Sequence, residues 1–406
     1  MRRNLTGFDF ASVMLVGVSL LPICGVRVEA PAEAAEKESM TPLLMKVAEA
    51  PVAFRGSDGR AHLVYELQVS NFSSGDASVE KVEVLADGAA LQTLDASAVA
   101  RQLQPAGTRE PSGKLAKSSQ ALLFLDVTLA ADSAMPKEIS HRVTARFAAA
   151  PPGHQEITSA GGVTSVSRRE AVVIGPPLQG ERYVSADSCC GSSRHRRAAM
   201  AINGNIWITQ RFAVDWEELD ASGHIYAGPK DKLESYAIFG KPALAVADAV
   251  VDSVTDGAEE QTPGQYPTSI ELDQADGNCV ILDLGADRAG KHSYALYAHL
   301  QPGSIRVHPG DKVKRGETLG LVGNTGNSVA PHLHFQVMDG PSSLASNGLP
   351  YEIDEFLMTG ETAGTEAFDK AEGEGLVLPV MAVQPARVVR SALPLDQLVI
   401  AFDGKR

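Results

Sequence analysis

Short segments in which apolar and polar residues alternate dominate the first half of the chain. Residues 62–69, 81–85, 121–127 and 141–147 each show the two-residue period of a β-strand with one buried face. Gly, Pro, Ser and Asp separate these segments, which is typical of turns between antiparallel strands. The pattern predicts a β-sandwich of immunoglobulin-like size over residues 50–175, preceded by a helix-compatible linker over residues 35–49.

The second half has a similar pattern with longer turns. Strands are predicted over residues 242–254, 277–284, 293–299, 318–322 and 332–338. Consecutive prolines at 176–177 stop both helix and ladder, so we place a domain boundary there. The fold class is therefore mostly β, with a compact antiparallel-sheet domain over residues 176–360. Apolar runs in the tail, residues 361–406, can add strands to either domain.

Composition narrows the class of protein and of partner. The 406 residues are 44% hydrophobic and 21% charged, as in globular proteins of more than one domain. A formal net charge of −14 makes nucleic acid and anionic membrane surfaces poor partners, because both repel it. The charge does not identify a substrate.

The N-terminus has the pattern of an export signal. Two arginines at positions 2 and 3 precede an apolar stretch over residues 10–23, and the small residues that follow predict a signal peptide over residues 1–34, cleaved near Ala34. We expect the mature protein to be soluble and secreted or periplasmic, since no later segment has about 20 consecutive apolar residues. Ile23 is bulky where a small residue is usual, so we expect no lipid anchor at Cys24.

Three cysteines remain after the signal region. Cys189 and Cys190 are adjacent, and a bridge between adjacent cysteines is strained. In an oxidising compartment we therefore expect at most one disulfide, between Cys279 and one member of the pair. No C-x-x-C spacing accompanies them, so they do not predict a zinc site.

Two histidines one residue apart carry the first chemical signal. On a β-strand His332 and His334 project from one face, about 6.6 Å apart along the strand, while Leu333 and Phe335 point into the core. Two further segments carry compatible groups, Asp215 in residues 211–215 and His299 in residues 297–300. A carboxylate and imidazoles drawn from separate strands are the donor set of a catalytic zinc site.

Residues from about 200 to 356 resemble the lysostaphin-type (LytM-like) zinc metallopeptidases, which cut peptide cross-bridges in bacterial peptidoglycan. The similarity is carried, in order, by residues 242–248, 297–300, 307–326 and 331–335. The resemblance implies that Asp215 and His334 are zinc ligands and that His299 and His332 act as the general base and oxyanion-stabilising pair. It also implies that a zinc-activated water attacks a peptide carbonyl of peptidoglycan.

One position departs from the family pattern. The third ligand in the family is a histidine four residues before the aspartate, and here that residue is Arg211. Arginine stays protonated and offers only donors, so it cannot bind the metal. Either Arg211 pairs with Asp215 and the zinc site is weakened or lost, or the chain bends so that Arg211 swings outward. In the second case His195 or His224 is the candidate that completes the site.

Two classes of function follow from these alternatives. The first is an exported zinc endopeptidase acting on peptidoglycan stem or cross-bridge peptides. The second is a metal-free relative that binds cell wall or regulates a partner hydrolase, with carboxylates bound by Arg194, Arg196, Arg197 and Arg211. For residues 50–175 alone, a structural adhesin module, a folded spacer, or a prodomain that blocks the groove also remain open.

Overall fold

The computed structural model describes residues 40–191 and 194–402, and the described residues from Thr41 onward form one compact unit. The predicted signal peptide and Cys24 lie outside the described residues. Two five-stranded antiparallel sheets come first, and we call residues 43–165 the N-terminal sheet pair. One sheet contains β1 (Leu43–Val47), β2 (Ala53–Arg55), β3 (Ala61–Asn71), β6 (Leu103–Pro105) and β8 (Gln120–Leu129). The other contains β4 (Ala77–Ala86), β5 (Ala89–Asp95), β7 (Lys114–Leu115), β9 (Glu138–Phe147) and β10 (Glu156–Ser165).

Alternation of side chains explains why these segments pair as strands. The inward-facing residues of β3, β4, β8 and β9 form one buried cluster, which includes Leu67, Val82, Leu125 and Val143. All four strands predicted in this half of the chain are confirmed, with ends that extend by a few residues. Helix α1 (Ala96–Gln102) connects β5 to β6 and begins at Asp95, whose side chain accepts a hydrogen bond from the backbone of Ala98. The immunoglobulin-like class of this region stays a prediction.

The prediction of a helix-compatible linker over residues 35–49 is wrong where the chain is described. Residues 43–47 form strand β1, which pairs antiparallel with β3 from Leu43↔Asn71 to Val47↔Leu67. Leu43 is buried in the cluster of the N-terminal sheet pair. The segment is therefore ordered by pairing with an edge that lies some twenty residues ahead in the chain, which local propensity does not reveal.

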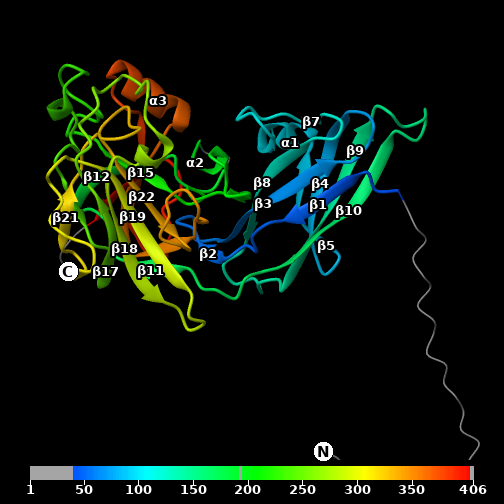
Figure 1. The fold of residues 1–406 in the computed structure, drawn as a ribbon, viewed down its shortest axis with the longest axis horizontal. Coiled ribbons are helices and arrows are strands. Elements are labelled where there is room, and N and C mark those ends of the chain that lie inside the picture. The colour runs from blue at the N-terminus through cyan, green and yellow to red at the C-terminus, as the bar shows by residue number, and fades with distance from the viewer. Residues whose placement is uncertain (1–39, 192–193, 403–406) are drawn as a thin grey trace, which may run out of the picture. The chain divides into compact units, whose positions relative to one another are not determined.

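An eleven-stranded sheet, which we call the central sheet, follows. Its path is β11 (Val172–Ile174), β23 (Tyr351–Thr362), β25 (Leu398–Phe402), β12 (Gly180–Ala186), β15 (Val214–Glu218), β22 (Leu333–Met338), β19 (His292–Leu300), β18 (Asn278–Ala286), β17 (Ala249–Thr255) and β20 (Lys312–Val313), with β24 (Val380–Ala392) paired to β23. Neighbouring strands are antiparallel except β11 and β23, which are parallel. The mostly β class of the fold is confirmed (Figure 1).

Smaller elements complete the second half of the chain. They are α2 (Arg194–Arg197), β13 (Met200–Ile202), β14 (Asn205–Trp207), the 3-10 turns Leu233–Ser235 and Leu272–Gln274, β16 (Pro242–Leu244), β21 (Thr318–Leu321) and α3 (Thr365–Glu374). The single strand predicted over residues 242–254 is split into β16 and β17, which join different sheets. The apolar runs of the tail add strands to the central sheet, where β25 lies between β23 and β12.

The N-terminal sheet pair and the central sheet share a hydrophobic core. Phe54 of β2 and Val64 of β3 belong to the same buried cluster as Trp216 and Phe335 of the central sheet. Phe54 packs edge to face against Phe212, with ring centroids 5.4 Å apart. The residues just before Asp215 are therefore packed against the first half of the chain.

The cysteines pair differently from the prediction. Cys189 is bonded to Cys190, and Cys279 is a buried free thiol. Cys279 lies on β18 in a separate small cluster, whereas Cys189 and Cys190 belong to the main core. The expected bridge from Cys279 is absent because its strand presents the thiol to a different layer of the molecule.

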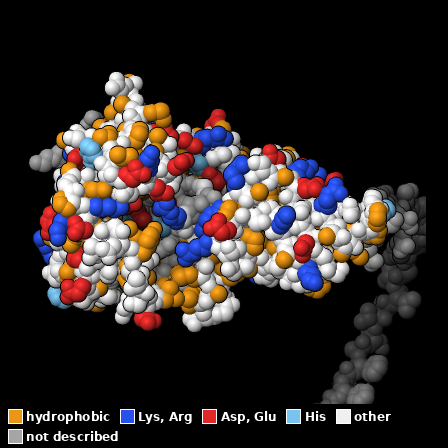
Figure 2. Space-filling view, turned by 90° about the horizontal axis from the view of Figure 1, so that it is seen from above, with side chains coloured by type: hydrophobic (Ala, Val, Ile, Leu, Met, Phe, Trp, Pro, Cys, Tyr) orange, Lys and Arg blue, Asp and Glu red, His pale blue; other side chains and the backbone are white. Residues whose placement is uncertain are grey.

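Surface charges of both signs are interspersed on the face shown in Figure 2, so the net negative charge does not form a single acidic field there. None of the helices in the described part of the chain has the length and apolar character needed to span a bilayer.

A buried histidine in the N-terminal sheet pair predicts acid sensitivity. His141 donates from Nδ1 to the Gly162 carbonyl (3.0 Å), accepts from the Tyr65 hydroxyl at Nε2 (2.8 Å), and burial lowers its pKa to about 4. An unfolded histidine titrates near 6.5, so the unfolded chain binds more protons between pH 6.5 and 4. The stability contributed by neutral His141 is full above pH 6.5 and is lost as the pH falls towards 4.

We therefore expect the wild type to lose about 3 kcal/mol more unfolding free energy between pH 7 and pH 4 than His141→Gln does. Urea unfolding at the two pH values measures this difference. His154→Gln, in an exposed turn, is the control and should behave as the wild type does. Equal acid sensitivity of wild type and His141→Gln would contradict the assignment.

Candidate functional site

Strands of the central sheet bring the predicted site residues together. Asp215 on β15 lies directly opposite His334 on the neighbouring strand β22. His299 is at the end of β19, next to β22 on its other side. His332 immediately precedes β22, and the prediction that it shares a face with His334, with Leu333 and Phe335 in the core, is confirmed.

A loop rich in small and polar residues, 323–328, supports this group of histidines. The Thr325 carbonyl accepts a hydrogen bond from Nδ1 of His299 (2.7 Å), and the Thr325 hydroxyl donates to the Leu300 carbonyl (2.9 Å). Gly326 has φ +75°, and a Cβ there would lie 2.3 Å from the backbone nitrogen of Gly277. Only glycine fits this turn, which explains the composition of the loop. His299 itself has φ +62°, a costly conformation held by these contacts.

The Asp215 carboxylate is the centre of the site. Its Oδ1 lies 2.8 Å from His334 Nδ1 and 3.5 Å from His332 Nε2, and its Oδ2 lies 3.3 Å from His195 Nε2. His195 is carried by α2, outside the central sheet. Burial disfavours the ionised carboxyl, but His195 and His332 outweigh burial and hold the pKa of Asp215 well below its usual range.

Hydrogen bonds on the far side of each imidazole decide which nitrogen faces Asp215. Nδ1 of His195 lies 2.9 Å from the Asp187 carbonyl, and Nε2 of His334 lies 2.9 Å from Oε1 of Gln336. Because both oxygens accept, each ring donates there and turns its other nitrogen towards the carboxylate. When His195 and His334 are neutral, the nitrogen that faces Asp215 has a lone pair, so two lone pairs face the Asp215 carboxylate.

This donor set fits a divalent metal ion. His195, Asp215 and His334 each offer one ligand atom, and the three atoms lie within 4.8 Å of one another. Two imidazoles and a carboxylate, with outer hydrogen bonds that orient the rings, are the three protein ligands of a catalytic zinc site with one open position. In the absence of a metal the same arrangement favours a protonated ring. Burial opposes the charge on His195, but Asp215 outweighs burial and raises its pKa to about 9.

The other two imidazoles form a second pair. His299 and His332 have ring centroids 4.7 Å apart. His332 Nδ1 lies 2.7 Å from the Ala330 carbonyl, and His299 Nδ1 is bound to Thr325, so the Nε2 atoms of both rings are left to face the site. Burial is the main cause that lowers the pKa of each ring, which keeps both neutral and able to accept a proton.

Arg211 does not pair with Asp215. Its guanidinium lies 2.8 Å from the carboxylate of Glu66 on β3, and its Nη1 donates to the Gly348 carbonyl (3.1 Å). The structure therefore follows the second alternative, in which the chain turns Arg211 away from Asp215. The position that the family gives to a histidine is used here for a buried ion pair with the N-terminal sheet pair.

The remaining histidine and arginine candidates lie elsewhere or are occupied. His224 lies in a turn with Asp220 (3.7 Å) and contributes to none of the metal-binding groups among the described residues. Arg194 forms ion pairs with Asp187 and Asp369, and Arg196 pairs with Glu66. These arginines hold the protein's own carboxylates, which removes the support for a carboxylate-binding cluster.

A cleft of about 260 Å³ opens at the site. His195, Asp215, His299, His332 and His334 all line it, together with residues of α3 and the loop 327–330. Glu217 and Glu372 also line this cleft. Burial, followed by repulsion from Glu372, raises the pKa of Glu217 well above its usual range, and burial raises the pKa of Glu372 to about 7. The cleft is therefore lined by both imidazoles and carboxyl groups.

Three supporting residues were not predicted from the sequence. Gln336 orients His334, Asp187 orients His195 through its carbonyl, and Glu66 holds Arg211. Gln336 carries a readable signal, since it follows His334 by two positions on a strand and so shares its face. Asp187 and Glu66 have no comparable local signal.

Comparison with known proteins identifies a family for part of this half of the chain. The family model described as peptidase family M23 matches residues 234–346, which include His299, His332 and His334. This segment belongs to that family, in its lysostaphin-type group. Asp215, Arg211 and His195 lie before the matched residues.

Individual relatives match over short stretches. The glycyl-glycine endopeptidase ALE-1 of Staphylococcus capitis is 52% identical over 42 residues, which cover 10% of this chain and 11% of that protein. The peptidoglycan DD-endopeptidase ShyA of Vibrio cholerae is 40% identical over 63 residues, 15% of this chain and 13% of that protein. The catalytic domain of lysostaphin from Staphylococcus simulans is 20% identical, covering 41% of this chain and 88% of that domain, with a TM-score of 0.22. The matches therefore span only 11% of the length of ALE-1 and 13% of the length of ShyA.

Proposed function

We propose that the protein is an exported zinc metalloendopeptidase that cuts peptides of peptidoglycan. The observation that carries the proposal is the arrangement of four buried or nearly buried imidazoles around the Asp215 carboxylate, each with its outer nitrogen bound to an oxygen acceptor. His195, Asp215 and His334 are the ligands in this proposal. His195 takes the place of the histidine that the family pattern has at position 211.

The protein's own groups supply positioning and proton transfer. A zinc ion bound there supplies Lewis-acid chemistry, which polarises a carbonyl and makes water a nucleophile near neutral pH. His299 and His332 both donate from Nδ1 to carbonyl oxygens, so each neutral ring has a lone pair at Nε2. Nε2 of either ring would accept a proton from the attacking water, and the imidazolium so formed would donate that proton to the developing oxyanion or to the leaving amine. Their Nδ1 bonds to Thr325 and Ala330 fix both rings in orientation.

The choice of substrate rests on the relatives. One is named as a glycyl-glycine endopeptidase and another as a peptidoglycan DD-endopeptidase, so a peptide bond of peptidoglycan is the substrate class that we propose.

Metal content of the wild type and of Arg211→His tests the proposal. We expect about one zinc per wild-type chain by elemental mass spectrometry and release of fragments from purified peptidoglycan. Arg211→His should hold no more zinc than the wild type, because the third ligand is already present. It should also lose about 2 kcal/mol of unfolding free energy, since Glu66 loses one of its buried partners.

Arg142→His, the same substitution at a half-exposed position on β9, is the control, and we expect it to leave the zinc content unchanged. Zinc in Arg211→His but none in the wild type would contradict the proposal. That result would identify the chain as a metal-free relative whose chemistry was lost at one position.

A further inference from the structure

The metal ligand His195 is carried by a very short helix. Helix α2 has four residues, and a single turn of helix is unstable by itself because nucleation is unfavourable. Residues 192–193, just before it, lie outside the described residues. His195 nonetheless meets Asp215 with its ring oriented by the Asp187 carbonyl. Tertiary contacts must therefore hold α2 in place.

Arg196, the residue after His195, makes these contacts with the N-terminal sheet pair. Its guanidinium is 1% exposed and donates to Glu66 Oε1 (2.8 Å), to the Tyr65 carbonyl (3.0 Å) and to the Leu125 carbonyl (3.3 Å). It also donates to the Cys190 carbonyl (2.7 Å), in the loop that leads to α2. One side chain thus ties the helix to β3, to β8 and to its own preceding loop.

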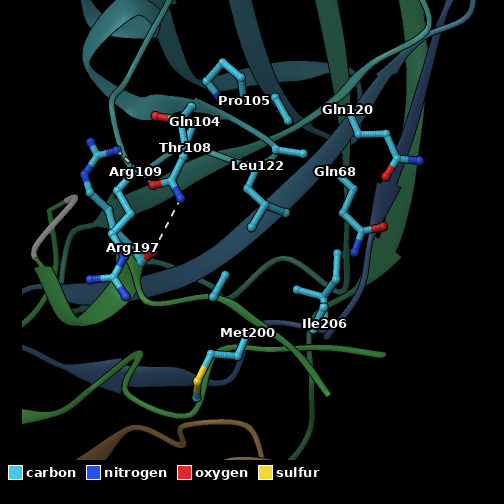
Figure 3. A pocket seen from close by; sticks show the side chains of 15 residues that line it. Gln68, Gln104, Pro105, Thr108, Arg109, Gln120, Leu122, Arg197, Met200 and Ile206 are labelled. Carbon is cyan, nitrogen blue, oxygen red and sulfur yellow. Dashed lines mark hydrogen bonds between the residues drawn. The ribbon is translucent and has the colours of Figure 1, made fainter. Parts of the chain in front are cut away.

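Arg197, the next residue, reinforces this contact. Its Nη2 donates to the Arg101 carbonyl (2.7 Å) and its Nη1 to Oε1 of Gln104 (3.2 Å). Figure 3 shows Arg197 and Gln104 at one side of a second cavity of about 390 Å³. Amide and apolar side chains and two arginines line that cavity, and its lining residues include no carboxylate, imidazole or thiol. They come from the N-terminal sheet pair and from residues 197–206, so we regard the cavity as part of the contact between these two regions rather than as a second reactive site.

Glu66 connects both sides of the metal centre. Its carboxylate bonds Arg196 through Oε1 and Arg211 through Oε2 (2.8 Å each). Glu66 is 4% exposed, and a buried carboxylate between two buried guanidiniums is stable only while all three charges stay paired. Arg196 is one residue from His195 and Arg211 is four residues from Asp215, so one carboxylate constrains two of the three segments that bring ligands to the site.

We propose that Glu66 is a positioning residue for the metal centre, and that the N-terminal sheet pair is a structural part of the peptidase rather than a prodomain. The inference rests on the proposed function, in which His195 is a metal ligand. Every residue that lines the catalytic cleft comes from residues 186–372, so the N-terminal sheet pair contributes none of the cleft's lining. Arg211 therefore has a structural role in this inference, since it anchors the segment that leads to Asp215 to Glu66.

Glu66→Gln tests the inference in the full-length mature chain. The substitution keeps the shape of the side chain and removes the charge that pairs both arginines. We expect the zinc dissociation constant, measured by competition with a chelator, to rise about tenfold or more, because metal binding must then also order the segment that carries His195. We also expect amide exchange over residues 194–198 to become about tenfold faster or more, with or without zinc.

Glu83→Gln is the matched control. Glu83 lies on β4 of the N-terminal sheet pair and pairs with Lys81 (3.2 Å) and Arg142 (3.6 Å), far along the chain from α2. It should leave the zinc affinity and the exchange of residues 194–198 unchanged. If Glu66→Gln does not fold, Arg196→Lys is the second variant, because lysine keeps the charge but cannot reach three carbonyl groups and a carboxylate together.

The outcomes separate this inference from the proposed function. Unchanged zinc affinity and unchanged amide exchange in Glu66→Gln overturn the inference while leaving the peptidase proposal intact. A wild type that binds no zinc overturns the proposed function. In that case faster exchange of residues 194–198 in Glu66→Gln still supports the positioning role of Glu66, and unchanged exchange rejects it.

Discussion

The His195→Ala variant is expected to bind zinc more than about a hundredfold more weakly than the wild type and to lose hydrolysis with it. His195 supplies one of three ligand atoms within 4.8 Å of one another, and Asp215 and His334 alone leave a divalent ion with two protein ligands. Losing an outer partner of a ligand costs about 10–100-fold in affinity, so losing the ligand itself should cost more. Chelator competition followed by elemental mass spectrometry gives the affinity and the stoichiometry.

His224→Ala is the control for His195→Ala. From the sequence, His195 and His224 are both candidates for the missing ligand. In the structure, His224 lies in a turn beside Asp220. We expect His224→Ala to keep about one zinc per chain. If His195→Ala also keeps full affinity, the third ligand is not His195 and the proposed ligand set is wrong.

Much of the site could be predicted because its signals are local. The two-residue period of a strand places His332 and His334 on one face, and the order of the family motifs identifies Asp215 and His299 as their partners. These conclusions require only that each segment forms a strand. The structure confirms the strands and brings the four residues together.

The replacement of the missing ligand could not be predicted, because it depends on a contact between distant segments. Arg211 and Glu66 are separated by 145 positions, and nothing near Arg211 indicates that its partner is a glutamate on β3. Sequence reasoning could show only that arginine does not bind metal and that His195 or His224 is the candidate if zinc is bound. The proposal of His195 rests on the position of α2, which brings its ring to Asp215.

Two of the incorrect predictions about the fold have the same origin. Strand β1 forms because residues 43–47 meet a free edge of β3, and the cysteine pairing follows from the layers in which β18 and the loop before α2 lie. Propensity and spacing describe a segment by itself. Strand pairing and burial are properties of two segments together, and they override the local preference.

Loss of hydrolysis without loss of zinc is expected for His299→Ala and for His332→Ala. Both rings have their Nδ1 atoms bound to carbonyl oxygens and neither belongs to the proposed ligand set. Removing a general acid or base typically costs about 10²–10⁴-fold in rate, so digestion of peptidoglycan should fall by that factor while about one zinc per chain remains. His292→Ala, at the other end of β19 and paired with Asp283, is the control and should keep both.

The same two variants decide between the two metal-binding groups of the site. His334 belongs to both groups, one with His195 and Asp215 and the other with His299 and His332. If zinc occupied the second group, His299→Ala or His332→Ala would lose the metal and His195→Ala would keep it. The carboxylate favours the first group, because Asp215 contributes a charge that partly neutralises the dication, whereas three neutral imidazoles contribute none. Retention of zinc together with loss of hydrolysis would therefore assign the metal to His195, Asp215 and His334, and the proton transfer to His299 and His332.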